Sequence, residues 1–182
     1  MPERERMSYS DYHSRICFWM KEIASMDNTI FLGQQVASED FYGTLKDVDI
    51  TKRLEMPVAE DMQTGLAICL SLQGFLPISI YQRMDFLPRA ADQIINHLDL
   101  LSHLSRNRFE PQVVIRTTVG TTNPLNVGAQ HSKDLTKMFK GVVGFEIFNV
   151  RTIRDIDEAY SYAIYTKRPS MIVEYQELYA GC

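Results

Sequence analysis

Thr29-Ile30-Phe31-Leu32-Gly33 is the stretch of sequence that decides the fold. It is a short, continuous apolar run that follows the turn residues Asp27-Asn28 and ends at a glycine. A run of this length between turn signals is typical of a strand buried on both faces, as the strands of a parallel sheet are. Parallel strands are joined by crossover connections that are usually helical, so we expect helices and strands to alternate on either side of this stretch.

The rest of the chain shows this alternation. Apolar residues at three- and four-residue spacing predict helices from Ser10 to the stop at Asp27 and over 57–73, 86–104 and 152–166. Short apolar runs predict strands over 75–81, 113–116, 143–150 and 171–174, and a loop rich in Gly, Thr and Asn covers 117–130. We therefore expect a single three-layer α/β domain over residues 10–182, with about five strands in a mostly parallel sheet, helices on both faces and a flexible N-terminus over 1–9. Ligands of such sheets bind at the carboxyl ends of the strands.

The composition is that of a soluble globular protein. A length of 182 residues corresponds to one domain, and 45% hydrophobic with 23% charged residues is an ordinary balance for a folded chain. The net charge is -4 and no basic stripe is present, which argues against a nucleic-acid partner. No apolar run approaches the roughly 18 residues of a membrane helix, and the first residues lack a secretory-signal pattern. We expect a cytoplasmic protein without membrane contact.

The usual metal and phosphate motifs are absent. The three cysteines, Cys17, Cys69 and Cys182, form no CxxC pair, which argues against a disulfide framework and a structural zinc site. Cys17 and Cys69 fall in apolar runs and are expected in the core, and Cys182 is expected to be exposed. Neither GxGxxG nor GxxxxGK[ST] occurs, and no cluster of His, Cys, Asp and Glu has metal-ligand spacing. A phosphorylated ligand would need another chain to hold its phosphates and any metal ion.

Three segments, in order, carry a family resemblance. They are Met56–Glu60 followed by Gly65-Leu66-Ala67, Asp85-Phe86 followed by Ala90–Asn96, and Val114-Ile115-Arg116 followed by Gly128–Ser132. The ordered set, together with Thr29–Val36, resembles the pyrimidine-binding domain of the transketolase family, and most closely that of the β subunits of thiamine-diphosphate-dependent 2-oxo-acid dehydrogenases. The resemblance covers nearly the whole chain and implies the thiamine-diphosphate pyrimidine-binding fold.

The resemblance implies a role for four residues. Glu60 falls on the family's catalytic glutamate, and Phe86 on the aromatic residue that packs against the aminopyrimidine ring. His131 falls on the active-site histidine of the Ala-Gln-His-Ser loop, and Gln82 matches a polar position that lines the site in some members. Taken alone, Glu60 would be interpreted as a glutamate that complements a helix dipole and Phe86 as a core residue, so these roles depend on the resemblance.

The sequence also departs from the family pattern. The turn after the first strand usually reads Gly-Glu-Asp or Gly-Glu-Glu, but here it is Gly33-Gln34-Gln35. Arg83 stands where an aromatic or apolar residue is common. Arg83 and Arg116 are candidates for binding an acidic substrate, with a salt-bridged structural arginine as the alternative. The Gly-Asp-Gly and asparagine that hold magnesium and diphosphate in thiamine enzymes are absent, and we expect no C-terminal domain after residue 182.

The resemblance implies an enzyme subunit. We expect the pyrimidine side of a split thiamine-diphosphate enzyme that acts on a small carbonyl substrate, by 2-oxo-acid decarboxylation as in the dehydrogenases, by transketolase-like transfer or by carboligation. A partner resembling the α subunit would hold the diphosphate and Mg²⁺, in an α2β2 heterotetramer. The alternative is a non-catalytic regulatory or assembly subunit on the same fold. A flavodoxin-like binding module is disfavoured because the chain has no phosphate-binding turn.

Overall fold

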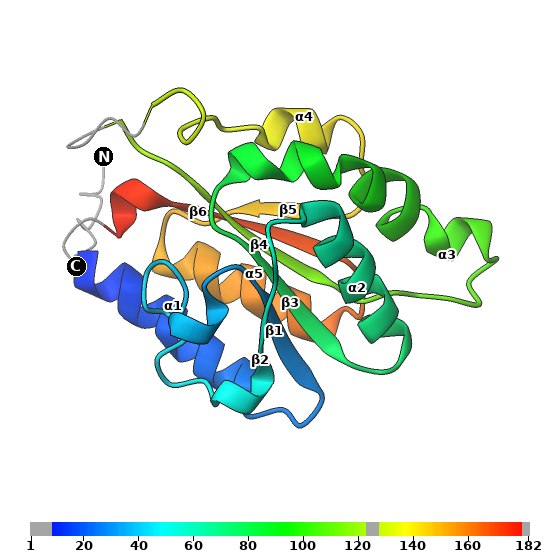
Figure 1. The fold of residues 1–182 in the computed structure, drawn as a ribbon, viewed down its shortest axis with the longest axis horizontal. Helices are drawn as coiled ribbons and strands as arrows, with labels where there is room; N and C mark the ends of the chain where they lie inside the picture. Colours follow the sequence, from blue (N-terminus) through cyan, green and yellow to red (C-terminus); the bar gives the residue numbers. More distant parts are fainter. Residues whose placement is uncertain (1–8, 123–127, 180–182) are drawn as a thin grey trace.

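Six parallel strands form one sheet in the order β2-β1-β3-β4-β6-β5 (Figure 1). The computed structural model describes residues 9–122 and 128–179. Of the flexible N-terminus predicted over 1–9, only Tyr9 is described, and it begins a helix; the rest of that segment and Cys182 lie outside the described residues. The strands are β1 Thr29–Gly33, β2 Arg53–Glu55, β3 Leu76–Tyr81, β4 Val114–Val119, β5 Glu146–Asn149 and β6 Ser170–Tyr175. The predicted three-layer α/β domain is confirmed, with one strand more than expected. The additional strand, β2, is a three-residue edge strand without an apolar run, which is why its sequence gave no signal.

Helices cover both faces of the sheet (Figure 1). Helices α1 (Tyr9–Ala24) and α5 (Ile153–Tyr165) pack on one face, and α2 (Glu60–Leu72), the segment Met84–Leu104 and α4 (Thr136–Lys140) pack on the other. Each face has its own hydrophobic core, because neighbouring residues of a strand point in opposite directions: Val114 lies in one core and Ile115 in the other. The predicted start of α5 after Thr152 is confirmed by a capping box between Thr152 and Asp155.

The predicted long helix over 86–104 is wrong in its continuity. The segment consists of 3-10 turns over Met84–Ala90, a π-helical stretch over Gln93–Leu98 and a short α3 over Leu101–Leu104. Pro88 lacks a backbone N–H and cannot continue a regular helix, and a π-helical stretch changes the periodicity again. Short 3-10 turns also occur at Val36–Ser38, Ile50–Lys52 and Gln176–Leu178.

Two further expectations need correction. Strand β4 continues to Val119, so the predicted loop over 117–130 begins three residues later. Thr117 and Thr118 are buried in the strand, although their polar side chains suggested a loop. Cys17 is buried as expected, but Cys69 is exposed because it lies on the outer face of α2.

A buried ionic network joins the carboxyl end of the sheet to the chain that follows β1. Arg116 on β4 is 2% exposed, and its Nε and Nη2 donate to the two carboxylate oxygens of Glu174 on β6 at 2.7 and 2.9 Å. Its Nη1 donates to Asp40 Oδ2 at 2.9 Å. The hydroxyls of Tyr160 and Tyr179 donate to Glu174 at 2.7 and 2.6 Å. Burial and the Glu174 carboxylate raise the pKa of both tyrosines, so they remain neutral donors.

Replacing Arg116 by methionine should strongly destabilise the fold. Asp40 and Glu174 would remain buried without a cation, and breaking a buried ion pair in this way costs about 3–5 kcal/mol of unfolding free energy. Urea denaturation followed by circular dichroism measures the loss. Arg154→Met is the matched control, because its ion pair with Glu158 is solvent-exposed and should contribute far less. Equal effects of the two substitutions would contradict a structural role for the network.

Candidate active site

Nine side chains line a cavity of about 690 Å³ at the carboxyl ends of β1 and β3. They come from the ends of these strands, from the loop after β1, from the start of α2, from the turns over Met84–Ala90 and from the loop after β4: Gln34, Phe41, Val58, Glu60, Gln82, Arg83, Phe86, Arg89 and His131. The paired ends of the two strands place these loops together, since Gly33 lies opposite Ile80 in the sheet. The cavity is therefore at the edge where parallel sheets bind ligands.

The structure brings five of the six predicted site residues to this cavity. They are Glu60, Gln82, Arg83, Phe86 and His131. Arg116 does not line it, because its guanidinium is used by the buried network with Asp40 and Glu174. Of the two alternatives for Arg116, the structure shows the salt-bridged arginine.

Glu60 is the first residue of α2, and its side chain is 3% exposed. Gln63, one turn later, pins the helix to the sheet: its Nε2 donates to Ser79 Oγ and to Ile80 O, both at 3.0 Å. The Glu60 Oε2 atom is buried without a hydrogen-bond partner among the described residues. The Arg89 Nε lies 3.0 Å away, as an ion pair that lacks hydrogen-bond geometry, and the Arg89 side chain is 68% exposed. The site thus presents a buried carboxyl oxygen that can accept or share a proton.

Phe86 and His131 meet edge to face across the cavity wall, with ring centroids 5.7 Å apart. The backbone of Gly120 passes so close to His131 that a Cβ there would lie 1.7 Å from the His131 carbonyl oxygen. The segment is also tied to Asp85, whose carboxylate accepts from Lys133 N at 3.2 Å. A glycine just after β4 and an aspartate beside Phe86 therefore position the histidine.

Arg83 and Gln82 follow β3. Gln82 Nε2 donates to Gln34 O at 3.1 Å, which joins the ends of β3 and β1. Arg83 is 6% exposed, and its Nη1 donates to Tyr42 Oη at 2.5 Å and to Gln82 O at 2.9 Å. Burial raises the pKa of Tyr42 to about 12, although Arg83 acts in the opposite direction. The Tyr42 hydroxyl is therefore neutral at ordinary pH, and the acceptors of Arg83 carry no charge.

Sequence reasoning missed Phe41, Val58 and Arg89 as residues of the site. Phe41 is an exposed apolar residue in a loop, and nothing in its local sequence distinguishes it from an ordinary surface position. Val58 lies in the Met56–Glu60 motif two residues before Glu60, and that position was the available signal. Arg89 follows Phe86 by three residues, so one turn of helix would have brought it to the same side. The three-residue spacing from Phe86 was therefore the signal in the sequence that could have identified Arg89 as a residue of the site.

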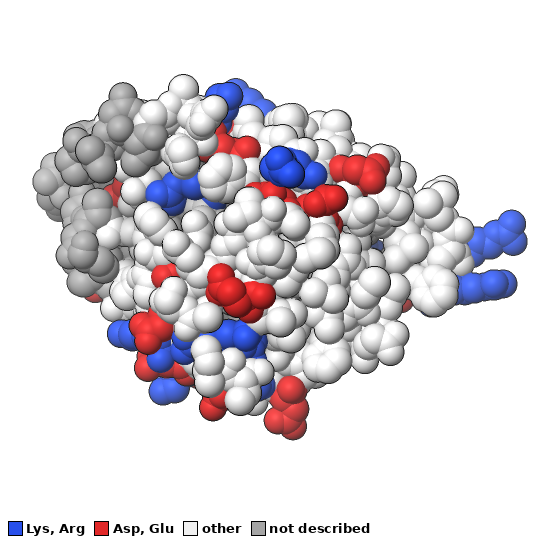
Figure 2. Space-filling view, in the orientation of Figure 1, with Lys and Arg blue, Asp and Glu red and all other residues white. Residues whose placement is uncertain are grey.

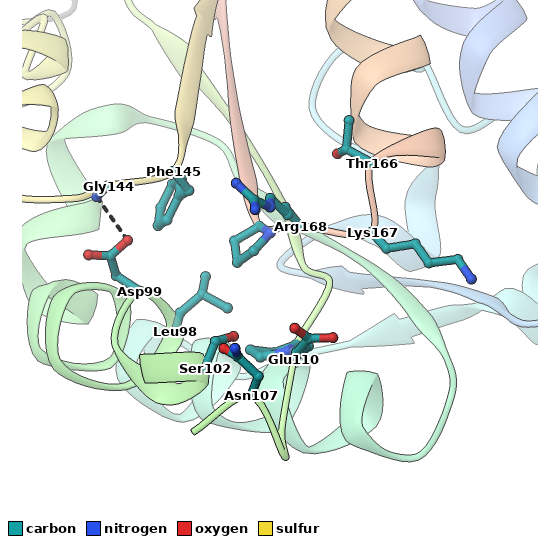
Figure 3. A pocket seen from close by; sticks show the side chains of 12 residues that line it. Leu98, Asp99, Ser102, Asn107, Glu110, Gly144, Phe145, Thr166, Lys167 and Arg168 are labelled. Carbon is teal, nitrogen blue, oxygen red and sulfur yellow. Dashed lines mark hydrogen bonds between the residues drawn. The ribbon is translucent and has the colours of Figure 1, made fainter. Parts of the chain in front are cut away.

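A second cavity of about 410 Å³ lies at the opposite, amino end of the sheet (Figure 3). Pro111, Phe145 and Pro169, which precede β4, β5 and β6, contribute to its lining. Asp99, whose Oδ1 accepts from Gly144 N at 2.9 Å, closes one side. Because ligands of parallel sheets bind at the carboxyl ends, the first cavity is the candidate active site.

Charged side chains are dispersed on the face of the molecule seen in Figure 2, where acidic and basic groups alternate with large uncharged areas. Within the described ranges, no group of three or more His, Cys, Asp or Glu side chains could hold a metal ion. No helix in the described part of the chain is long and apolar enough to cross a membrane.

The fold and this cavity define a pyrimidine-binding domain of the transketolase type. Residues 18–181 match the family described as transketolase, pyrimidine binding domain, and the chain belongs to this family, which depends on thiamine diphosphate. The β subunit of the pyruvate dehydrogenase E1 component of Cyanidium caldarium is 30% identical over 164 residues, which cover 87% of this chain and 50% of that protein. The same subunit of Porphyra purpurea is 30% identical over 147 residues, or 81% of this chain and 43% of the relative. The chain spans about half the length of such relatives.

Two solved structures share the fold. A split-gene transketolase, described as an inactive β4 tetramer, superposes with a TM-score of 0.66 at 17% identity, covering 88% of this chain and 49% of that chain. Transketolase from Campylobacter jejuni superposes with a TM-score of 0.73 at 13% identity, covering 90% of this chain and 25% of that chain. At these identities the likeness concerns the fold alone, and it agrees with the sheet and helix layers described above.

Replacing Gly120 by alanine should displace His131 from Phe86. The added carbon would collide with the His131 carbonyl, so the segment has to move, with a loss of about 1–3 kcal/mol as in other overpacked sites. The NMR shifts of the His131 ring protons, which lie beside the Phe86 ring, report the displacement. Gly141→Ala is the control, because its added carbon would be 3.4 Å from the nearest atom. Unchanged His131 shifts in Gly120→Ala would contradict this account of how the histidine is positioned.

Proposed function

We propose that the chain is the pyrimidine-side subunit of a split thiamine-diphosphate enzyme that cleaves or forms a carbon–carbon bond next to a carbonyl. The single observation that carries this proposal is the buried Glu60 carboxyl at the wall of the cavity, whose Oε2 has no hydrogen-bond partner among the described residues and only an ion pair with the exposed Arg89. A buried polar atom without a partner is rare in a folded protein and calls for an explanation, such as a ligand. Membership in a thiamine-diphosphate-dependent family supports this cofactor as that ligand.

The residues of the cavity fit the aminopyrimidine end of the cofactor. Glu60 would hydrogen-bond a ring nitrogen and share a proton with it, Phe86 would pack against the ring, and Val58 would supply an apolar wall. His131, at the same wall, would transfer protons near the reacting carbonyl, a role to which an imidazole side chain is suited. When bound, the cofactor supplies the carbanion chemistry that splits or joins a bond beside a carbonyl. Arg89 forms an ion pair with the Glu60 carboxylate, but its exposed side chain can turn into solvent with little loss of stability.

A partner subunit completes the proposed site. The sequence contains no diphosphate and magnesium motif, so an α-like chain would hold these groups. Val58 is 73% exposed beside the cavity, and Phe41 and Met62 nearby are also exposed, which suits coverage by another protein. We propose two copies of each chain around a two-fold axis, with the cytoplasm as the location. The split-gene transketolase, described as an inactive β4 tetramer, supports the idea that a chain of this fold depends on a second subunit.

Two types of reaction are proposed, in order of preference. The relatives at about 30% identity are subunits of pyruvate dehydrogenase, which favours decarboxylation of a 2-oxo acid. Transketolase-like transfer or carboligation is the second candidate, since the chain matches the pyrimidine-binding domain family of transketolase. A non-catalytic assembly subunit on the same fold remains the alternative from another class, and the Glu60 substitution below discriminates it.

The isolated chain should bind thiamine diphosphate weakly, because most of the cofactor's charge lies on the diphosphate. Mixed with its partner, the chain should bind the cofactor in a magnesium-dependent way. Isothermal titration calorimetry of the single chain and of the co-purified complex, with and without Mg²⁺, measures the difference. Tight magnesium-dependent binding by the chain alone would sink the proposal of a divided site.

Glu60→Gln should leave cofactor binding to the complex nearly intact and slow the exchange of the thiazolium proton. The substitution keeps size and polarity but removes the shared proton, and loss of a main proton-transfer group lowers rates by about 10²–10⁴. Rapid-quench deuterium exchange with NMR detection measures this step. Asp61→Asn is the matched control, since Asp61 also lies in the first turn of α2 but is exposed. Equal exchange rates in wild type and Glu60→Gln would remove Glu60 from the mechanism and favour the assembly subunit.

A further inference from the structure

Arg83 is a buried cation at the cavity wall without an acidic partner in the described part of the chain. Its side chain makes none of the ion pairs found there, and its Nη1 donates only to the neutral oxygens of Tyr42 and Gln82. Its Nε is buried with no hydrogen-bond partner. The ring of Phe41 lies over the guanidinium, with 4.7 Å from Cζ to the ring centroid. The positive charge is held firmly and is not neutralised.

Comparison with Arg116 shows that this is unusual within the same molecule. Arg116 is also buried, but two carboxylates neutralise it. Removing a guanidinium from water is costly unless an anion compensates it, and a cation–π contact offsets only part of this cost. The surroundings of Arg83 therefore suit a guanidinium whose charge is balanced by an anion that binds from outside the chain.

The neighbours of Arg83 in the cavity wall point in the same direction. Gln34 and Gln82, which also line the cavity, have neutral amide side chains. Phe41, which covers the guanidinium, is half exposed on the loop after β1, so its ring can move aside with little loss of packing.

We propose that Arg83 binds an anionic group of the substrate, a carboxylate or a phosphate remote from the reacting carbonyl. The assignment of this anion to a substrate rests on the proposed function, whereas the anion site itself rests on the geometry of Arg83 alone. The Tyr42 hydroxyl orients one arm of the guanidinium, which leaves the Nε side of the planar fork for bidentate binding. The diphosphate of the cofactor is not the anion meant, since the chain has no phosphate-binding turn.

The first experiment uses the chain alone and needs no activity. The thermal midpoints of wild type, Arg83→Met, Arg83→Lys and Arg154→Met are compared in chloride, inorganic phosphate and succinate at equal ionic strength. Phosphate or succinate should raise the midpoints of wild type and of the exposed control Arg154→Met by the same amount. The increase should be smaller for Arg83→Lys and smallest for Arg83→Met, which keeps only the general stabilisation by these salts. In chloride, Arg83→Met should be at least as stable as wild type, because an uncompensated cation has been removed.

If Arg83 has only a structural role, the thermal midpoints should follow a different pattern. The loss of its contacts with Tyr42, Gln82 and Phe41 would then lower the midpoint of Arg83→Met in chloride, and neither anion would stabilise wild type more than the variant. That combination would overturn the proposal. If Arg83→Met does not fold, calorimetric titration of wild type and Arg83→Lys with the two anions decides, and equal affinities overturn it.

The second experiment assigns the anion to a substrate. With the partner subunit present, kcat/KM is measured for pyruvate, for 2-oxoglutarate as a 2-oxo acid with a second carboxylate, and for a phosphorylated ketose. Arg83→Met should lower, at least tenfold, the preference over pyruvate for one of the two substrates that carry an anionic group remote from the carbonyl, and the affected substrate identifies the anion. Glu60→Gln should lower all rates alike. Unchanged preference overturns the substrate assignment. Absence of all activity in wild type overturns the proposed function, while the thermal result on the anion site stands by itself.

Discussion

The buried contact between Arg116 and the carboxylates of Glu174 and Asp40 is the constraint on which the carboxyl end of the sheet depends. A guanidinium in the interior must be compensated, so the strand that carries Glu174 and the loop that carries Asp40 both have to meet β4 at one point. Tyrosines from α5 and from the turn after β6 complete the hydrogen bonds. The network thereby connects the sheet, one helix layer and the loop after β1.

This constraint reaches the candidate active site through the loop after β1. Phe41 and Tyr42 follow Asp40 directly, and both contact Arg83 at the cavity wall. Holding Asp40 therefore holds the backbone that carries Phe41 and the Tyr42 hydroxyl that orients Arg83. In this molecule a fully compensated arginine stabilises the fold, and it positions a second, uncompensated arginine for which a ligand is proposed.

Glu60 and Arg83 are the two buried charged groups that line the cavity. Each has one buried atom without a hydrogen-bond partner in the described residues, Oε2 in Glu60 and Nε in Arg83. Unsatisfied buried atoms destabilise a fold, and proteins retain them mainly where a ligand or a reaction uses them. Their presence in one cavity, at the ligand-binding edge of a parallel sheet, supports one site with an acidic end for the pyrimidine ring and a basic end for a substrate anion.

By itself, the sequence determined the alternation of strands and helices and the family. Of the six site residues predicted from it, five line the cavity. These features could be predicted because local apolar periodicity and ordered motifs are properties of the chain alone. It did not determine the broken helix over Met84–Leu104, where Pro88 and a π-helical stretch override periodicity, or the edge strand β2, whose pairing depends on β1. Only the tertiary structure showed that Arg116 and Arg83 have different roles. The two arginines have the same chemistry, and their roles differ because carboxylates distant in the sequence meet one of them and not the other.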